Sequence, residues 1–216
     1  MNTLIFDPAH GKDVKGKRSP DGLHEEWKWS RSCIRSVMYD ILETPELTFN
    51  VHSPYLSYTN EPGLTTRVRK YNELTEDKTI MLSLHNDASP PYLCDKDGWA
   101  EPNGIAFWTS KGDTLADRCV NFMFERFKVM MPNQQFRTAY WLGEKEKVKD
   151  PDYEADFYVL AGSEKLRPKY EGILMEVLFQ NNREDVKKLL SWDWNLLFNT
   201  TLHLVLIDLF DNIDTL

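Results

Sequence analysis

Three short apolar runs constrain the fold of this 216-residue chain more than any other feature. They span Leu4–Phe6, Ile80–Leu84 and Ile173–Phe179. Runs of this length and composition are typical of strands that are covered on both faces in a mainly parallel sheet. Thr48–His52 and Ile105–Trp108 are two weaker strand candidates. The pattern predicts a sheet buried between two layers.

Helical patterns separate these strands. Residues 26–42 carry an apolar stripe with the spacing of a helix packed on a sheet, made of Ile34, Val37, Met38, Ile41 and Leu42. Leu64–Leu74 and Thr114–Phe127 have a similar pattern, and Arg183–Leu190 precedes a longer helix that reaches about Leu209. We therefore expect an α/β fold, with a mainly parallel twisted sheet flanked by helices on both faces, in a single domain over residues 1–216.

The charge balance excludes some classes of partner. A net charge of −8 and a pI near 5.2 argue against bulk attraction to nucleic acid or to an anionic membrane surface. A basic cluster in one predicted loop, best explained as solvated, consists of Lys12, Lys15, Lys17 and Arg18. No integral membrane segment is expected, because no run approaches the ~20 apolar residues that a spanning helix needs.

Cysteine usage and the first residues bear on the compartment. Cys33, Cys94 and Cys119 show no Cys-x-x-Cys spacing, so we expect reduced, buried thiols rather than disulfides or a thiolate zinc site. The strand-like stretch Asn2–Asp7 carries no basic region or long apolar segment typical of a secretory signal. The expectation is synthesis and folding in a cytoplasm. Nothing in the sequence specifies an oligomeric state.

Two segments are predicted to be loops or insertions. Ala88–Asn103 is rich in Pro and Asp, and Gly143–Asp156 is rich in charge. Either can form a substrate-facing wall or a plain surface loop. Trp99 and Trp141, which are also expected in loops, can stack on sugars or fill space, and packing is the favoured interpretation.

Side chains with metal-binding chemistry coincide with the predicted strands. His10 and His85 closely follow strand patterns, and Glu176 lies inside one. The carboxyl ends of parallel strands form one rim, where open α/β sheets bind ligands, so these side chains can converge. A buried carboxylate needs an ion pair, hydrogen bonds or a metal. The alternatives are a salt bridge for Glu176 and hydrogen-bonded core positions for the two histidines.

Two imidazoles and one carboxylate are a frequent ligand set for catalytic zinc, which keeps a fourth position for water. The third ligand is expected at the start of the first helix. The stripe residues lie eight, eleven and fifteen positions after Glu26, which places Glu26 near the buried face, and these residues are Ile34, Val37 and Ile41. Glu25 is rotated by about 100° towards solvent, where it can cap the helix. His24 is a weaker candidate ligand.

Five segments in this order resemble zinc-dependent N-acetylmuramoyl-L-alanine amidases of the type 3 amidase family, particularly the catalytic domains of phage endolysins. They are Asp7–Gly11, Glu26–Ser30, Leu64–Arg67 with Asn72, Ser83–Ala88, and Glu176–Phe179 with Asn182 and Asp185. Ala9 stands where the family has glycine, and Asp87 stands where it has Asn. Asn86 and Asp87 can contact substrate or cap the loop after the strand.

The resemblance implies that His10, Glu26 and His85 hold Zn²⁺ and that Glu176 is the catalytic base. It further implies a peptidoglycan substrate cut between N-acetylmuramic acid and L-alanine, by an endolysin that acts on the wall after release. One alternative is a zinc peptidase that cuts within the stem peptide. The other is a wall-binding module without hydrolysis, which the joint presence of the four residues disfavours.

Overall fold

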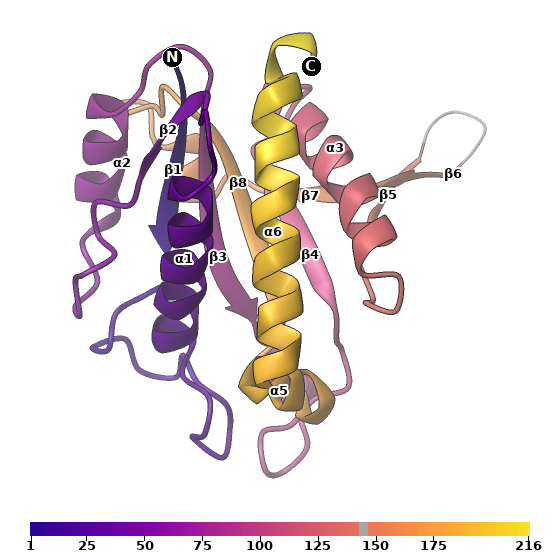
Figure 1. The fold of residues 1–216 in the computed structure, drawn as a ribbon. Coiled ribbons are helices and arrows are strands. Elements are labelled where there is room, and N and C mark those ends of the chain that lie inside the picture. The colour runs from indigo at the N-terminus through magenta and orange to yellow at the C-terminus, as the bar shows by residue number, and fades with distance from the viewer. Residues whose placement is uncertain (143–146) are drawn as a thin grey trace.

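A six-stranded sheet runs through the centre of the computed structural model, which describes residues 1–142 and 147–216 (Figure 1). The strand order is β2-β1-β3-β8-β4-β7. The strands are β1 (Asn2–Pro8), β2 (Phe49–His52), β3 (Thr79–Asp87), β4 (Ile105–Thr109), β7 (Asp152–Glu154) and β8 (Glu171–Phe179).

The sheet is mainly parallel, as predicted. β1 pairs in parallel with β2 and β3, and β3 pairs in parallel with β8. β4 reverses direction and pairs antiparallel with β8, and β7 follows β4 at the edge. The three predicted apolar runs form β1, β3 and β8, three consecutive strands in the interior of the sheet.

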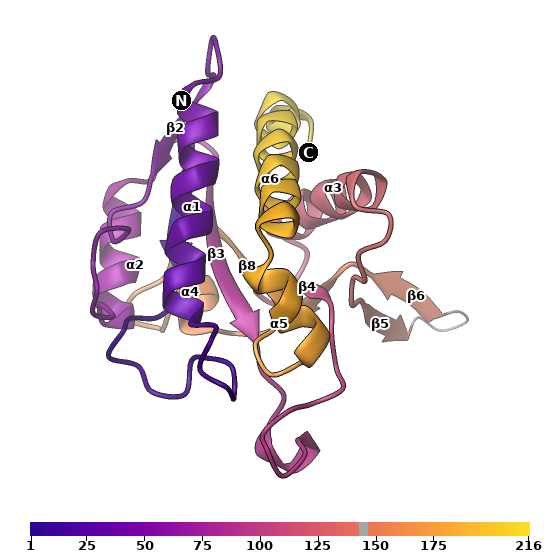
Figure 2. The same cartoon turned by 60° about the horizontal axis from the view of Figure 1, so that its bottom comes forward.

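Helices cover both faces of the sheet, which confirms the predicted layers. α1 (Glu26–Leu42), α3 (Leu115–Met130) and α6 (Trp192–Asn212) pack on one face. α2 (Leu64–Glu73) and the short α4 (Tyr158–Ala161) pack on the other, as Figure 2 shows. Side chains alternate along β1, so that Leu4 and Phe6 face the first layer and Ile5 faces the second.

The long helix α6 packs on α1 and α3 (Figure 1). It is the one described helix that is long and apolar enough, by length and composition, to cross a membrane. Its predicted core positions are all buried against the domain, namely Phe198, Leu202, Val205, Leu206 and Leu209. This burial is what a core helix of a folded domain requires. α5 (Arg183–Leu190) precedes it with the bounds expected from the sequence.

The prediction of a loop over Gly143–Asp156 is wrong for two described segments. The first is β6 (Lys147–Asp150), which pairs antiparallel with β5 (Ala139–Leu142), and the pair projects from the body (Figures 1 and 2). The strand β7 then joins the main sheet, where Tyr153 stacks on Trp108 with ring centroids 4.8 Å apart. Because β7 forms by pairing with the distant strand β4, the charged sequence of this segment shows no strand pattern of its own. Residues 143–146 and the Trp141 side chain lie outside the described part.

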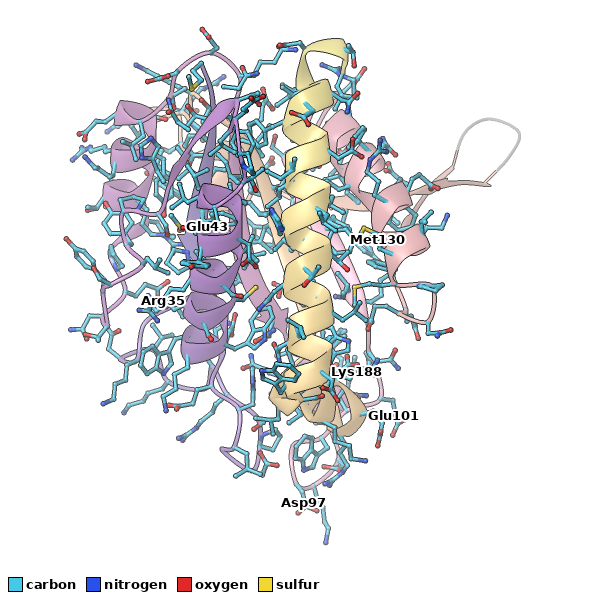
Figure 3. The ribbon with its side chains drawn as sticks, viewed as in Figure 1. Arg35, Glu43, Asp97, Glu101, Met130 and Lys188 are labelled. Carbon is cyan, nitrogen blue, oxygen red and sulfur yellow. The ribbon has the colours of Figure 1, made fainter. Side chains whose placement is uncertain are left out.

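The second predicted loop, residues 88–103, is largely irregular, with one short 3-10 turn at Pro91–Leu93. It extends at the end of the molecule where α5 lies, as the labelled Asp97 and Glu101 show (Figure 3). Trp99 is only 9% exposed and carries the Arg183 guanidinium 4.4 Å above its ring, so the packing interpretation holds for this residue.

All three cysteines are free. Cys33 and Cys119 are buried, as expected. Cys94 departs from the expectation because it is only half-buried, in the irregular loop after β3.

Candidate metal centre

His10, Glu26 and His85 meet at the carboxyl ends of β1 and β3. One possible ligand atom from each residue lies within 4.8 Å of the others. His85 Nδ1 is 3.0 Å from Glu26 Oε1, and His10 Nε2 is 3.7 Å from the same oxygen. His10 comes two residues after β1, whereas His85 lies inside β3 rather than after it. The structure thus brings together the three side chains that the sequence proposed as ligands.

The three side chains form a site that opens on its imidazole side. Glu26 is fully buried, whereas the side chains of His10 and His85 are 16% and 12% exposed. The two rings meet edge to face with centroids 4.9 Å apart. The two imidazoles therefore form the solvent-facing side of the cluster, and the carboxylate forms its buried side.

The turn that presents His10 is fixed by α1. His10 has a φ of 39°, in the left-handed region that non-glycine residues rarely adopt. Ser30 Oγ accepts from the Ala9 backbone N–H at 2.9 Å and donates to the Leu84 carbonyl at 2.7 Å. Arg31 Nη1 donates to the Ala9 carbonyl at 2.7 Å. These contacts hold the conformation that aims His10 at the cluster.

Glu26 is held as a carboxylate. Its Oε1 accepts from the backbone N–H of Asn86 at 3.1 Å, and its Oε2 accepts from Gln180 Nε2 at 3.3 Å. Burial opposes ionisation, but the contacts with His85 and His10 hold the pKa of Glu26 below its usual value. A charged oxygen therefore faces both imidazoles.

The neighbours of Glu26 have other contacts. Glu25 occupies the N-cap position, but its side chain makes no capping hydrogen bond and instead pairs with Lys28, so the predicted capping role is wrong. His24 is buried, and its Nε2 lies 2.8 Å from Asn86 Oδ1. It is not part of the candidate metal-binding cluster.

Glu176 faces the cluster from the next strand. It is the register partner of His85 between β3 and β8. Its Oε2 is buried without a hydrogen-bond partner, and among the side chains that the structure describes, which exclude residues 140–149, none forms a salt bridge with it, so the salt-bridge alternative is not realised there. Burial, together with the charges of Asp87 and Glu26, raises the pKa of Glu176 well above its usual value.

The sheet is irregular beside Glu176. The register between β3 and β8 shifts between His85 and Asp87, and Leu178 has a φ of 66°. Irregularities of this kind redirect side chains next to active sites. Here the shift ends the regular pairing just beyond the His85–Glu176 pair.

Asn86 and Asp87 fasten the end of β3. Asn86 Nδ2 donates to the Val177 carbonyl at 2.6 Å, which makes it a buried bridge between β3 and β8. Asp87 Oδ1 accepts from the Ala88 N–H at 2.7 Å, the contact expected of a loop cap, and Oδ2 lies 2.6 Å from Arg137 Nη2. Of the two roles considered for this pair, the loop cap fits Asp87.

A buried ion pair lies behind the site. Asp7 pairs with Arg67 of α2 and accepts a hydrogen bond of 2.6 Å from Ser83 Oγ. Burial opposes ionisation, but the Arg67 charge and these hydrogen bonds lower the pKa of Asp7. The pair joins β1, β3 and α2 beneath the turn that carries His10.

Sequence reasoning missed Glu61 and Gln180. Glu61 lies in the segment between β2 and α2, with Oε1 3.3 Å from His10 Nδ1. Gln180 contacts Glu26 from the segment after β8. Neither residue has a periodic or motif signal, although Arg67, which contacts Glu61, belongs to the segment Leu64–Arg67 that resembles the amidase family (the Leu-x-x-Arg pattern).

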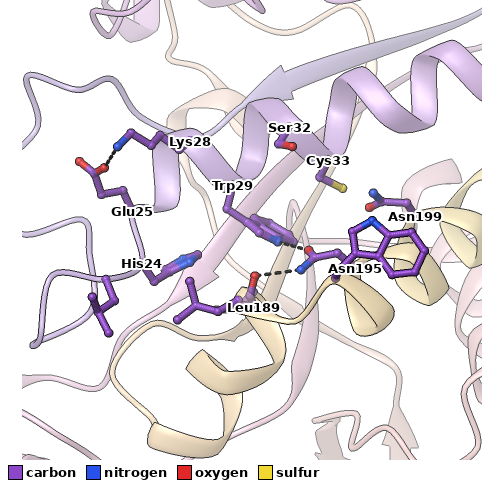
Figure 4. A pocket seen from close by; sticks show the side chains of 12 residues that line it. His24, Glu25, Lys28, Trp29, Ser32, Cys33, Leu189, Asn195 and Asn199 are labelled. Carbon is purple, nitrogen blue, oxygen red and sulfur yellow. Dashed lines mark hydrogen bonds and ion pairs between the residues drawn. The ribbon is translucent and has the colours of Figure 1, made fainter.

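The outer side of α1 is tied to α6. A cavity of about 450 Å³ between these helices includes His24, Glu25 and Trp29 in its lining (Figure 4). Trp29 Nε1 donates to Asn195 Oδ1 at 2.7 Å, and Asn195 Nδ2 donates to the Leu189 carbonyl at 2.9 Å. These bonds fix the first turn of α1, where Glu26 begins the helix.

The basic cluster forms a loop, as predicted. Lys12, Lys15 and Arg18 are exposed, and Lys17 is half-buried. The Lys17 carbonyl accepts from the Glu26 N–H at 3.2 Å, so the loop contacts the site through its backbone.

The sequence matches no protein-family model and no curated protein. The structure matches solved N-acetylmuramoyl-L-alanine amidases over nearly their whole length. The amidase from Clostridium difficile 630 has a TM-score of 0.69 and 17% identity, with 97% of each chain covered. The catalytic domain of CwlV from Bacillus (Paenibacillus) polymyxa var. colistinus has a TM-score of 0.71 and 16% identity, with 98% of this chain and 99% of that chain covered.

The N-acetylmuramyl-L-alanine amidase from Mycobacterium smegmatis gives the same picture. Its TM-score is 0.71 at 12% identity, with 99% of this chain and 97% of that chain covered. The fold expected from the motif resemblance is therefore confirmed. At these identities the likeness concerns the fold.

Proposed function

We propose that residues 1–216 form the catalytic domain of a zinc-dependent N-acetylmuramoyl-L-alanine amidase that acts on peptidoglycan. The observation that carries this proposal is the gathering of His10, Glu26 and His85 within 4.8 Å, with Glu176, whose Oε2 is buried, on the adjacent strand. The shared fold with solved amidases supports the substrate class.

The donor set fits a catalytic zinc ion. Two imidazoles and one carboxylate would leave a fourth position on a zinc ion open for water. The partial exposure of the His10 and His85 side chains supports access of water to such an ion. The chemistry that a bound zinc ion supplies is a lowered pKa for water and polarisation of a carbonyl oxygen. Asn86 and Gln180 orient the Glu26 carboxylate through their hydrogen bonds to its two oxygens.

Glu176 is the proposed proton carrier. The pKa of Glu176 is raised from the ordinary carboxyl value towards neutral pH. General acid–base catalysis is most effective when the pKa of the group lies near the operating pH. The carboxylate accepts the proton of the attacking water and returns it to the nitrogen of the departing amine. The partnerless Oε2 is free for this exchange, since no described residue competes for it.

The proposed bond is the amide between the lactyl group of N-acetylmuramic acid and L-alanine. Mass analysis of products from purified sacculi tests this choice, because an amidase releases whole stem peptides with a free L-alanine amino terminus. Fragments cut within the stem would instead indicate a zinc peptidase, and binding without products would indicate a wall-binding module. Activity should disappear with a chelator and return with added zinc.

We also propose a phage endolysin role, supported by the resemblance of Glu26–Ser30 to phage members of the family. In this role the protein is made in the host cytoplasm and reaches the wall after release. Fractionation of infected cells over time is the test. Protein outside intact cells before lysis would contradict this localisation while leaving the amidase activity unaffected.

A further inference from the structure

His10 lies between two carboxylates. Its Nε2 is 3.7 Å from Glu26 Oε1, inside the proposed metal cluster. Its Nδ1 is 3.3 Å from Glu61 Oε1 and 3.4 Å from Glu61 Oε2, on the opposite side of the ring. Nε2 is therefore the nitrogen available to a metal, and Nδ1 is the nitrogen available to donate a hydrogen bond.

We propose that Glu61 is the positioning residue for His10. Its carboxylate accepts the Nδ1 proton, which fixes the ring orientation and leaves the Nε2 lone pair free for a metal. A carboxylate in this place also makes the imidazole a more basic ligand. The inference rests on the proposed zinc site, since the orientation of His10 matters most when Nε2 binds an ion.

Several contacts hold Glu61 in place. Arg67 Nη1 lies 3.3 Å from Glu61 Oε1, and the backbone N–H of Glu61 donates to Asp13 Oδ1 at 2.9 Å. The Lys12 N–H donates to the Thr59 carbonyl at 2.7 Å, which joins the two loops on either side of the site. With a side chain only 23% exposed, Glu61 is partly shielded from competing water.

The glycine after His10 permits this arrangement. A Cβ atom on Gly11 would collide with the backbone nitrogen of Glu61 and the carbonyl carbon of Asn60. The loop before α2 thus packs directly on the Gly11 backbone. A side chain at this position would push away the segment that carries Glu61, which gives a physical reason for the His10-Gly11 dipeptide.

The same arrangement explains a residue of the Leu-x-x-Arg pattern. Arg67 bonds the buried Asp7 through Nε at 2.9 Å and contacts Glu61 through Nη1. One guanidinium therefore joins the base of the His10 turn to the carboxylate that contacts its ring. Through Arg67, α2 therefore supports the proposed metal centre.

Zinc affinity tests this role without relying on catalysis. The full chain is stripped of metal, and zinc is titrated against a chromogenic chelator for wild type, Glu61→Ala, Glu61→Gln and the control Glu73→Gln. Loss of a carboxylate that orients a ligating histidine typically weakens metal binding about 10–100-fold. We expect that loss for Glu61→Ala and a smaller one for Glu61→Gln, whose amide oxygen still accepts from Nδ1. The exposed Glu73 should have no effect.

A spectroscopic measurement separates positioning from general stability. In the zinc-loaded wild type, ¹⁵N–¹H NMR should detect a protected Nδ1–H on His10, and Glu61→Ala should lose that protection. Gly11→Ala keeps the carboxylate but displaces its loop, so it should weaken zinc binding in the same direction. The protected signal in the wild type and the weaker zinc binding of Gly11→Ala support the role even if Glu61→Ala unfolds.

The outcomes distinguish this inference from the proposed function. Wild-type zinc affinity in a folded Glu61→Ala variant, with an unchanged His10 signal, would overturn the role of Glu61 and leave the zinc site intact. Failure of the wild-type chain to bind zinc would overturn the zinc site itself, and with it any positioning role for Glu61.

Discussion

His85 and Glu176 are register partners on the adjacent parallel strands β3 and β8. The backbone ladder therefore fixes a proposed ligand and the proposed proton carrier relative to each other. Both strands are buried in the centre of the sheet, so this spacing is set by the most stable part of the fold. Groups held on strands are positioned more accurately than groups on loops.

Glu176→Ala should remove hydrolysis while keeping the metal. General acid–base residues typically contribute about 10²–10⁴-fold to the rate, and release of stem peptides from sacculi should fall by that amount. Zinc content, measured on the same preparation, should remain at the wild-type level because Glu176 is not in the described cluster. Full activity in this variant would show that another group carries the proton.

Glu26→Ala and Glu25→Ala form a matched pair at the start of α1. Glu26 is fully buried and faces both histidines, whereas Glu25 pairs with Lys28. Glu26→Ala should lose zinc and activity, and Glu25→Ala should keep both. Metal analysis after dialysis checks this, and the reverse pattern would contradict the proposed ligand set.

Arg67→Met should strongly destabilise the domain. Removing one partner of a buried ion pair typically costs about 3–5 kcal/mol, because the other charge is left buried. Denaturant unfolding measures this loss. The double variant Asp7→Leu with Arg67→Met should recover part of it, since neither charge then remains. Equal stability of Arg67→Met and the double variant would mean that an unpaired Asp7 costs the folded domain little.

The same pair predicts a pH effect. The pKa of Asp7 is lowered in the folded state, so its contribution is present above the usual carboxyl range and is lost as pH falls through the folded pKa. Wild-type stability should therefore decline on acidification. The Asp7→Leu, Arg67→Met double variant should show a shallower decline.

Asp152 should produce the opposite pH dependence. Burial, with Asp150 nearby, raises the pKa of Asp152 to about 7. The folded state then binds more protons than the unfolded state between the usual Asp pKa and about 7. The free energy of unfolding therefore falls as the pH rises through this range, by at most about 1.4 kcal/mol per pH unit. Asp152→Asn should remove this slope in thermal unfolding between pH 4 and pH 7. An unchanged slope would assign it to other groups.

Much of the fold could be predicted because the strands are doubly covered. Buried central strands require continuous apolar runs, and these runs identify β1, β3 and β8 directly. The apolar stripe of α1 likewise distinguished Glu26, which is buried, from Glu25, which pairs with Lys28. A single sequence therefore shows on which face of a helix a residue lies.

Contacts made by loops could not be predicted in this way. Glu61 meets His10 only because the loop before α2 packs on the Gly11 backbone, and Gln180 reaches Glu26 from beyond β8. The strands β6 and β7 arise from pairing with β5 and β4 rather than from their own charged sequences. Such interactions depend on tertiary structure that no local pattern encodes.

The reversed direction of β4 affects how this fold can diversify. Because β4 runs antiparallel to β8, Ile105 at its start lies beside Val177, near the end of β8. The segment 88–103 therefore leaves β3 and enters β4 at the same rim of the sheet. Both of its attachment points border the proposed active site. Residues can be gained or lost in this segment without disturbing strand register, so evolution can reshape the surroundings of the reaction while the scaffold stays constant.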